Sequence, residues 1–148
     1  MNRKIVPDIV QPTKVEGVAP EATILDAAKL MRNKKIAALV VTDGDGKLIG
    51  IVTERDVVFR AVAAGLDPAS STIADIMTAN PDTLSPNDSA SDALELMQTR
   101  NYRHLPVVED GNCIAVVSIR DLFSSVKQSL EESIRETEAF VFGDRYGA

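Results

Sequence analysis

The stretch GIVTERD at residues 50–56 decides the fold of this chain, because it occurs a second time, as AVVSIRD, at residues 115–121. In both stretches an apolar run is followed by a hydroxyl residue, an arginine and an aspartate. Further upstream, residues 20–41 align with residues 86–107 and are identical at seven of 22 positions. The chain therefore consists mostly of one unit that is used twice.

Each copy has the pattern of a β-α-β-β-α unit. A hydroxyl residue three positions before an aspartate, at Thr23 and at Ser89, predicts the start of a helix, because the two side chains can cap it reciprocally. Two apolar runs joined by a glycine-bearing turn follow in each copy and predict a β-hairpin. The hydroxyls of Thr53 and Ser118 predict that a second helix begins directly after each hairpin.

The two copies are expected to form one packed structure, because a single unit of this size buries its own core poorly. The predicted fold class is α/β (α+β), with two βαββα repeats packed sheet to sheet around a pseudo-two-fold axis, plus a C-terminal helical extension. The predicted segments are an N-terminal segment at 1–16, the first repeat at 17–65, a linker at 66–74, the second repeat at 75–126, and a C-terminal helix and tail at 127–148.

The last helix is predicted to run past the second repeat. Phe123, Val126, Leu130 and Ile134 form a narrow apolar stripe on it. We expect this helix to protrude and to end in a frayed tail at 142–148. An exposed apolar stripe needs cover, and this favours a homodimer.

The composition excludes several classes of protein. The chain has 148 residues, 45% hydrophobic and 26% charged, which suits one compact domain or two very small ones. One cysteine and one histidine are too few for a disulfide framework or a closed zinc site, so we predict no metal. The net charge of −6 disfavours nucleic acid, and no apolar stretch is long enough to cross a bilayer. We therefore expect a cytoplasmic protein without membrane or nucleic-acid partners.

The repeated hydroxyl, arginine and aspartate residues are the strongest candidates for a binding site. The N–H groups at a helix N-terminus favour an anion such as phosphate, and Arg55 and Arg120 could add a charge-assisted fork. The carboxylates of Asp56 and Asp121 could accept hydrogen bonds from vicinal ribose hydroxyls. This arrangement is typical of a nucleotide site. We assign the phosphate to Thr53 and Ser118, and the faces of the base to the strand residues Val18, Ala38, Leu84 and Pro106.

Simpler explanations of these residues stay open. A hydroxyl paired with an aspartate is also explained as a helix cap worth about 1 kcal/mol, without a ligand, although a cap does not explain the repeated arginine. Arg103 and His104 could contact phosphate or base, or they could be solvated residues at a strand edge. The motifs GxGxxG, GxxxxGK[ST], GxSxG and HExxH do not occur, and two similar sites do not suit catalysis. We therefore predict no catalytic residues.

The sequence resembles the CBS-domain pair, a family named after the regulatory region of cystathionine β-synthase. The resemblance covers roughly residues 17–126 and rests on GIVTERD, AVVSIRD, DIMTANPDTLSP at 75–86 and RHLPVV at 103–108. It implies an intramolecular pair of βαββα units that binds AMP, ADP, ATP, NAD or S-adenosylmethionine in a cleft and serves as a sensor.

The resemblance also implies roles for individual residues. By it, Thr53 and Ser118 contact the phosphate, and Asp56 and Asp121 contact the ribose. The second copy departs from the family where Ala115 replaces a glycine, which adds a methyl group where the backbone could approach a ligand. We therefore expect the two sites to be unequal.

The sequence thus predicts a non-catalytic regulatory module without a covalent cofactor. An adenosine nucleotide (AMP, ADP, ATP or NAD) is expected in the clefts between the repeats, where it makes a homodimer an energy or redox-state sensor that a separate effector protein reads. The paired arginines favour a phosphorylated ligand over the cationic S-adenosylmethionine. The alternatives are a ligand-free scaffold that uses the pair for dimerisation and partner binding, and a small nucleotide-hydrolysing or redox enzyme.

Overall fold

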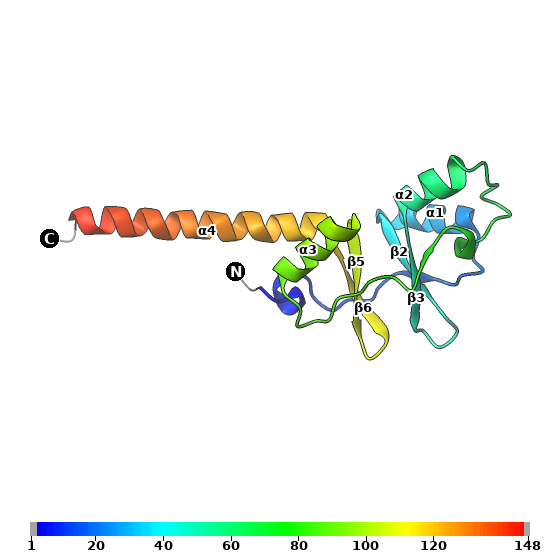
Figure 1. Cartoon of the computed structure of the whole chain (residues 1–148), viewed down its shortest axis with the longest axis horizontal. Helices are drawn as coiled ribbons and strands as arrows, with labels where there is room; N and C mark the ends of the chain where they lie inside the picture. Colours follow the sequence, from blue (N-terminus) through cyan, green and yellow to red (C-terminus); the bar gives the residue numbers. More distant parts are fainter. Residues whose placement is uncertain (1–2, 147–148) are drawn as a thin grey trace.

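The computed structural model describes residues 3–146, with side chains described through residue 142, and it contains the repeated unit twice (Figure 1). The first repeat consists of β1 (Gly17–Val18), α1 (Ile24–Lys34), β2 (Ala38–Thr42), β3 (Leu48–Thr53), and a helix that begins as α2 (Glu54–Asp56) and continues in π-helical turns as η2 (Val57–Val62). The second consists of α3 (Ala90–Arg100), β5 (His104–Glu109), β6 (Asn112–Ser118) and α4 (Ile119–Tyr146). Three short elements complete the chain: η1 (Ile5–Ile9), η3 (Ile73–Asp75) and β4 (Thr78–Ala79).

Two antiparallel hairpins form the centres of the two sheets. β2 pairs with β3, and β5 pairs with β6. β1 joins β2 in parallel, and Leu84 makes the equivalent parallel bridge to Val107. β4 adds an antiparallel edge to β3, so the first sheet has the order β1-β2-β3-β4. The predicted class and the two hairpins are confirmed, whereas β4 was not expected.

The predicted caps start both first helices. The hydroxyl of Thr23 accepts a hydrogen bond from the N–H of Asp26 at 3.1 Å. The hydroxyl of Ser89 accepts one from the N–H of Asp92 at 3.0 Å, and the Asp92 carboxylate accepts one in return from the N–H of Ser89. α1 and α3 therefore begin where the sequence pattern places them.

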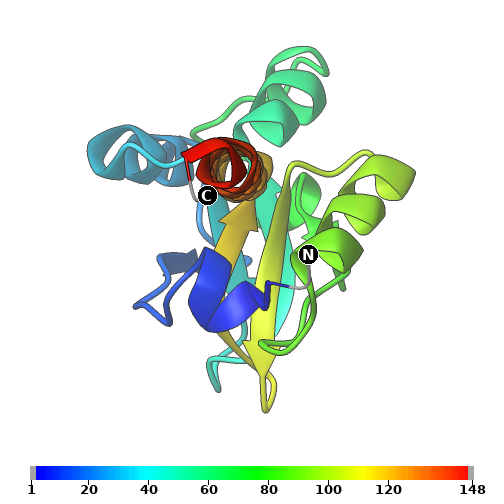
Figure 2. The same ribbon diagram turned by 90° about the vertical axis from the view of Figure 1, so that its left-hand side faces the viewer.

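Each sheet is covered by helices on one face and by the other repeat on the opposite face. In the first sheet, Leu39 and Val41 are buried in a core that includes residues of α1. Val40 and Ile51 are register partners, and they are buried outside this core, with 2% and 7% exposed. Because side chains alternate between the faces of a strand, these two face the second repeat. The repeats therefore pack sheet to sheet, and in Figure 2 the yellow strands of the second lie in front of the cyan strands of the first.

The segment that precedes each repeat packs on the other repeat. Ile5 of η1 is fully buried in the core of the second repeat, and its N–H donates to the carbonyl of Asp88 at 2.8 Å. In the other direction, Ile73 and Ile76 are buried in the core of the first repeat. These two segments therefore hold the repeats together in addition to the contact between their sheets.

Helix α4 projects far beyond the second repeat (Figure 1). Its first part is held against the repeat by the buried residues Leu122, Ser125 and Ser129. Arg3 of the N-terminal segment adds an ion pair to Glu132, with 3.2 Å between Nη2 and Oε2. The helix is therefore anchored over its first turns and exposed further along.

The expected frayed tail is largely helical, so this part of the sequence prediction is wrong. α4 continues to Tyr146, and only residues 147–148 of the predicted tail lie outside the described residues. A single glycine at position 143 costs a helix interior only about 1 kcal/mol relative to alanine, which is too little to end a long helix.

Gly50 lies at a close approach between β3 and the segment that carries β4. A Cβ atom at this position would lie 2.7 Å from Sδ of Met77 and 3.2 Å from the carbonyl oxygen of Thr78. The sequence interpretation assigned the need for a small residue here to an approaching ligand. The structure shows that the neighbour is the protein itself.

We expect Gly50→Ala to lower the free energy of unfolding by about 1–3 kcal/mol, because the added methyl overpacks this contact. Urea denaturation measures the change. The control is Gly44→Ala, because a Cβ atom at position 44 has no neighbour within 4 Å. That substitution should change the free energy by less than about 0.5 kcal/mol. If Gly50→Ala matched the control, the close approach would have no energetic consequence.

Candidate functional site

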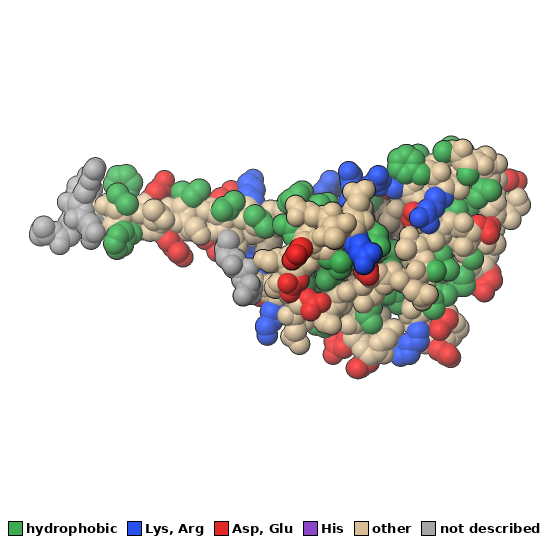
Figure 3. Space-filling view, in the orientation of Figure 1, with side chains coloured by type: hydrophobic (Ala, Val, Ile, Leu, Met, Phe, Trp, Pro, Cys, Tyr) green, Lys and Arg blue, Asp and Glu red, His purple; other side chains and the backbone are tan. Residues whose placement is uncertain are grey.

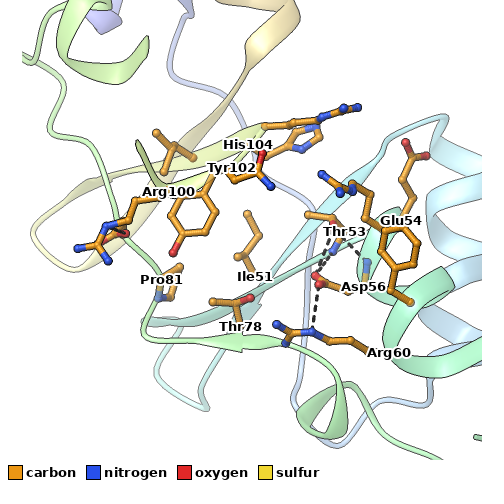
Figure 4. A pocket seen from close by; sticks show the side chains of 16 residues that line it. Ile51, Thr53, Glu54, Asp56, Arg60, Thr78, Pro81, Arg100, Tyr102 and His104 are labelled. Atoms are coloured by element: carbon orange, nitrogen blue, oxygen red, sulfur yellow. Dashed lines mark hydrogen bonds and ion pairs between the residues drawn. The ribbon is translucent and has the colours of Figure 1, made fainter. Parts of the chain in front are cut away.

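A cavity of about 310 Å³ opens where the two repeats meet. The end of β3, the start of α2 and part of η2 line it from the first repeat. The end of α3, the turn that follows and the start of β5 line it from the second repeat. In Figure 4, Thr53 and Asp56 lie across the cavity from Tyr102, with Ile51 and Thr78 between them.

The first wall is built around a complete capping box. Oδ2 of Asp56 accepts hydrogen bonds from the N–H of Thr53 at 2.9 Å and from its hydroxyl at 3.2 Å. In return, Oγ1 of Thr53 accepts one from the N–H of Asp56 at 3.3 Å. Oδ1 of Asp56 has a long ion pair to Nε of Arg60, at 3.7 Å, and the Asp56 side chain is 16% exposed. One carboxylate oxygen is thus committed to the cap, and the other is available to a ligand.

The second wall presents an aromatic ring beside basic groups. Tyr102, Arg103 and His104 follow one another from the end of α3 into β5, and all three line the cavity. Tyr102 and His104 are half-buried. The corresponding residue to Tyr102 in the first repeat, 66 positions earlier, is Ile36. Tyr102 therefore has no aromatic counterpart at the equivalent position, and the first repeat adds a different ring, Phe59 of η2, which lies under the guanidinium of Arg55.

The cavity is locally positive in a chain that is negative overall. Among the described residues, its walls contain one more cation than carboxylates, whereas the whole chain has a net charge of −6. The cations are Arg55, Arg60, Arg100 and Arg103, and the carboxylates are Glu54, Asp56 and Asp82. Arg60 and Arg100 have ion pairs to Asp56 and Asp82, so Arg55 and Arg103 are the cations that favour an anionic ligand.

His104 is uncharged at neutral pH in this structure. Burial lowers the pKa of its imidazole, and the charge of Arg103 lowers it further. The carboxylates of Glu54 and Asp121 oppose this by raising the pKa, but burial is the larger effect. The imidazole therefore offers a hydrogen bond to a ligand rather than a positive charge.

The lowered pKa of His104 makes stability depend on pH in a defined direction. The unfolded chain binds a proton at this side chain more readily than the folded chain, so the folded state is favoured above the usual pKa of histidine and loses this advantage as the pH falls. Between pH 7 and pH 5, the free energy of unfolding should fall more steeply in the wild type than in His104→Gln. Urea denaturation at several pH values measures both slopes, and equal slopes would contradict the assignment.

The structure brings five of the predicted site residues to this cavity and leaves seven away from it. The five are Thr53, Arg55, Asp56, Arg103 and His104. The seven that do not line it are Ser118, Arg120, Asp121, Val18, Ala38, Leu84 and Pro106.

Ser118 and Asp121 form the same capping box as their counterparts. The N–H of Ser118 donates to Oδ2 of Asp121 at 2.9 Å, and the N–H of Asp121 donates to Oγ of Ser118 at 3.1 Å. These bonds start α4, and Arg120 is exposed beside them. The local structure is therefore duplicated, whereas this cavity is built around the first copy. A ligand contact of the second copy stays a prediction.

The apolar residues assigned to the base lie in the sheets. Leu84 is buried in the core of the second repeat, and Val18 packs against the core of the first. Ala38 is the register partner of Thr53. Pro106 is buried, and its carbonyl accepts a hydrogen bond from the N–H of Leu84 at 2.9 Å. None of the four lines this cavity, and their contact with a base stays a prediction.

Sequence reasoning missed several residues that the structure places in the cavity. Tyr102 had a usable signal, since it is one of two tyrosines and directly precedes Arg103 and His104. Thr78 and Pro81 had none, because they reach the cavity through the pairing of β4 with β3, which is a contact distant in sequence.

No group of three or more His, Cys, Asp or Glu residues within the described part of the chain could hold a metal ion. No helix of that part is long and apolar enough to cross a membrane.

Comparison with known proteins identifies the family. The CBS domain profile matches residues 6–62 and 73–128. The CBS domain-containing protein YhcV of Bacillus subtilis is 35% identical over 121 residues, which cover 82% of this chain and 84% of YhcV. By contrast, the chain spans 22% of the length of the CBS domain-containing protein CBSCBSPB2 of Arabidopsis thaliana, at 33% identity over 117 residues, or 79% of this chain.

Solved structures agree with the sequence relatives. A protein with CBS domains from Burkholderia ambifaria MC40-6 superimposes with a TM-score of 0.78 at 34% identity, covering 84% of this chain and 93% of that one. The CBS domain pair of protein MJ0100, in complex with 5′-methylthioadenosine and S-adenosyl-L-methionine, gives a TM-score of 0.74 at 27% identity, covering 87% and 99%. With two tandem copies of the profile and the same fold, the chain belongs to the CBS domain family.

Proposed function

We propose that this protein is a non-catalytic regulatory module that binds an adenosine-containing nucleotide in the cavity between its repeats. The observation that carries the proposal is the placement of the Thr53 to Asp56 turn across one cavity from Tyr102 and His104. A carboxylate, a helix N-terminus and an aromatic ring there match the ribose, phosphate and base of one nucleotide. The adenosine derivatives bound by the related pair of MJ0100 support the same ligand class.

Each part of the ligand has a suitable group in the cavity. Oδ1 of Asp56 can accept hydrogen bonds from the ribose hydroxyls, because only a long ion pair occupies it. At the start of α2 the N–H groups of Glu54 and Asp56 already donate to the carbonyl of Ala37 and the hydroxyl of Thr53, so the N–H and the guanidinium of Arg55 are the groups that suit a phosphate. Tyr102 and Ile51 provide apolar faces for the purine.

The charge of the cavity narrows the ligand class. Phosphorylated adenosine compounds fit the excess of arginine over carboxylate, whereas the cationic S-adenosylmethionine does not. The adenosine monophosphate unit is common to AMP, ADP, ATP and NAD. We therefore propose this unit as the recognised part of the ligand.

The proposed signal follows from the position of the cavity between two repeats. A ligand that touches both repeats stabilises the arrangement in which both sets of contacts are made, and so shifts the population of that arrangement. A homodimer passes this change on, and a separate effector protein reads it. We infer an energy or redox-state sensor from the ligand class.

Thermal unfolding with a ligand panel tests this function. We expect AMP, ADP, ATP or NAD to raise the melting temperature by several degrees, since a ligand at 100 times its dissociation constant adds about 2.7 kcal/mol. GTP and S-adenosylmethionine are the controls and should produce smaller shifts. No shift with any compound would favour a ligand-free scaffold, a function with which the complete capping boxes of Asp56 and Asp121 are compatible.

A further inference from the structure

Helix α4 has an apolar stripe without a partner in the described structure. Phe123, Val126, Leu130, Ile134 and Val141 are each between 39% and 57% exposed. Their separations keep them on one face of a helix with 3.6 residues per turn, over a length of about 27 Å. Figure 3 shows hydrophobic side chains recurring along the projecting part of this helix. We call these five residues the α4 stripe.

The charges beside the α4 stripe change sign along the helix. Arg120, Lys127, Glu131 and Glu138 are exposed and lie on the same side of the stripe, at about 40–80° from Phe123 around the helix. The first two are basic and the last two are acidic. The opposite side of the stripe carries the uncharged residues Ser133, Thr137 and Phe140, and Ser129 next to them is buried against the second repeat. One flank is therefore charged with opposite signs at its two ends, and the other is nearly neutral.

We propose that the part of the α4 stripe from Phe123 to Ile134 packs against the same residues of a second copy of this chain in antiparallel orientation. In an antiparallel pair the two-fold axis is perpendicular to both helices, so the charged flanks of the two copies lie next to each other along the same edge of the interface. Lys127 then lies opposite the partner's Glu131, and Arg120 lies opposite the partner's Glu138. Both pairs are symmetric about position 129, so one register satisfies both.

The apolar residues specify nearly the same register. Packing Val126 on the partner's Leu130 centres the pair at position 128, and packing Phe123 on the partner's Ile134 centres it between positions 128 and 129. The register centre given by the apolar contacts and the one given by the charge pairs thus agree within about one residue, which is less than one helical turn.

A parallel pair has no such complementarity. Its two-fold axis runs along the helices, so the charged flank of each copy faces the uncharged flank of the other. The acidic and basic groups then have no partner of opposite sign across the interface. The alternation of charge along one flank therefore favours a second copy in the antiparallel orientation over the parallel one.

This inference rests on the homodimer of the proposed function and specifies its geometry. Each pair of repeats lies at the N-terminal end of its own α4 (Figure 1). Antiparallel pairing therefore places the two nucleotide cavities at opposite ends of the paired helices.

Disulfide cross-linking tests the orientation. In the full chain with Cys113→Ser, one sample carries Phe123→Cys and another, with an affinity tag that changes its mass, carries Ile134→Cys. We expect the mixed and re-equilibrated samples to form a disulfide-linked heterodimer and each sample alone to remain largely uncross-linked, because identical positions lie about 16 Å apart along the axis. Cross-linking of each variant to itself would show a parallel pair and overturn the proposal, as would no cross-link in the mixture.

Sedimentation equilibrium tests the surface itself. We expect Leu130→Glu to raise the dimer dissociation constant at least tenfold. The matched control is Ala139→Glu, which adds the same charge on the exposed opposite face of the helix and should leave dimerisation unchanged. Lys127→Glu should weaken the dimer, and combining it with Glu131→Lys should restore it.

The outcomes separate this inference from the proposed function. A wild-type chain that stays monomeric would overturn both the pairing of α4 and the homodimer, while nucleotide binding would be judged by its own thermal shift. A Leu130→Glu chain that dimerises like the wild type would overturn the pairing of α4 alone, since the dimer would then use another face.

Discussion

Asp56→Ala should weaken the binding of AMP by at least about tenfold, whereas Asp121→Ala should leave it within about twofold. Asp56 lines the cavity with one carboxylate oxygen available to the ribose, and Asp121 does not line it. A hydrogen bond to a charged group contributes about 1.5–3 kcal/mol, and about 1.4 kcal/mol corresponds to a tenfold change in affinity. Isothermal titration calorimetry with AMP measures both dissociation constants.

The two substitutions form a matched pair. Each removes the aspartate of a capping box that exchanges two hydrogen bonds with a hydroxyl residue three positions earlier. Asp56 additionally accepts a hydrogen bond from the Thr53 hydroxyl and has the long ion pair to Arg60. Loss of either cap should lower the stability of the free protein by about 1 kcal/mol, with the larger loss for Asp56→Ala. Equal losses of AMP affinity would mean that binding responds to stability alone. A loss confined to Asp121→Ala would place the ligand around the second copy of the motif.

Ile5→Ala should lower the free energy of unfolding by about 2–5 kcal/mol, although residue 5 lies outside both sequence repeats. Its side chain is fully buried in the core of the second repeat, together with Met97 and Leu122. Removing three carbon atoms there leaves a cavity that the surrounding β-sheet and helices cannot fill. Urea denaturation followed by circular dichroism measures the loss.

A graded series controls this prediction. Ile5→Val removes one methylene and should cost about 0.5–1.5 kcal/mol, and Met97→Ala in the same core should cost about as much as Ile5→Ala. An Ile5→Ala protein within about 0.5 kcal/mol of the wild type would show that the N-terminal segment does not contribute to this core.

The parts of the fold that depend on local sequence were predictable. The hydroxyl and aspartate pairs at Thr53 and Ser89 mark helix starts because a cap involves residues three positions apart. The hairpins follow from alternating apolar runs around turns. The burial of Ile5 and Ile76 in the core of the opposite repeat was not predictable, because it depends on contacts across the whole chain.

The candidate site was predictable only in part, for a related reason. The motif that surrounds Asp56 recurs around Asp121 with the same hydrogen bonds, so local sequence indicates two similar sites. A cavity also depends on what faces the motif from the other repeat. Tyr102 faces Thr53 and Asp56 across the cavity, whereas the position equivalent to Tyr102 in the first repeat is Ile36, which packs against the first core. The two copies of the motif thus differ in the residues that face them from the other repeat.

An amide NMR titration with AMP tests the account most directly, because it locates the ligand residue by residue. We expect the largest chemical shift changes at Thr53 to Asp56 and at Tyr102 to Leu105, on the two facing walls of the cavity. Ser118 to Asp121 should change much less. Changes centred on Ser118 to Asp121, or none at millimolar AMP, would contradict nucleotide binding in this cavity.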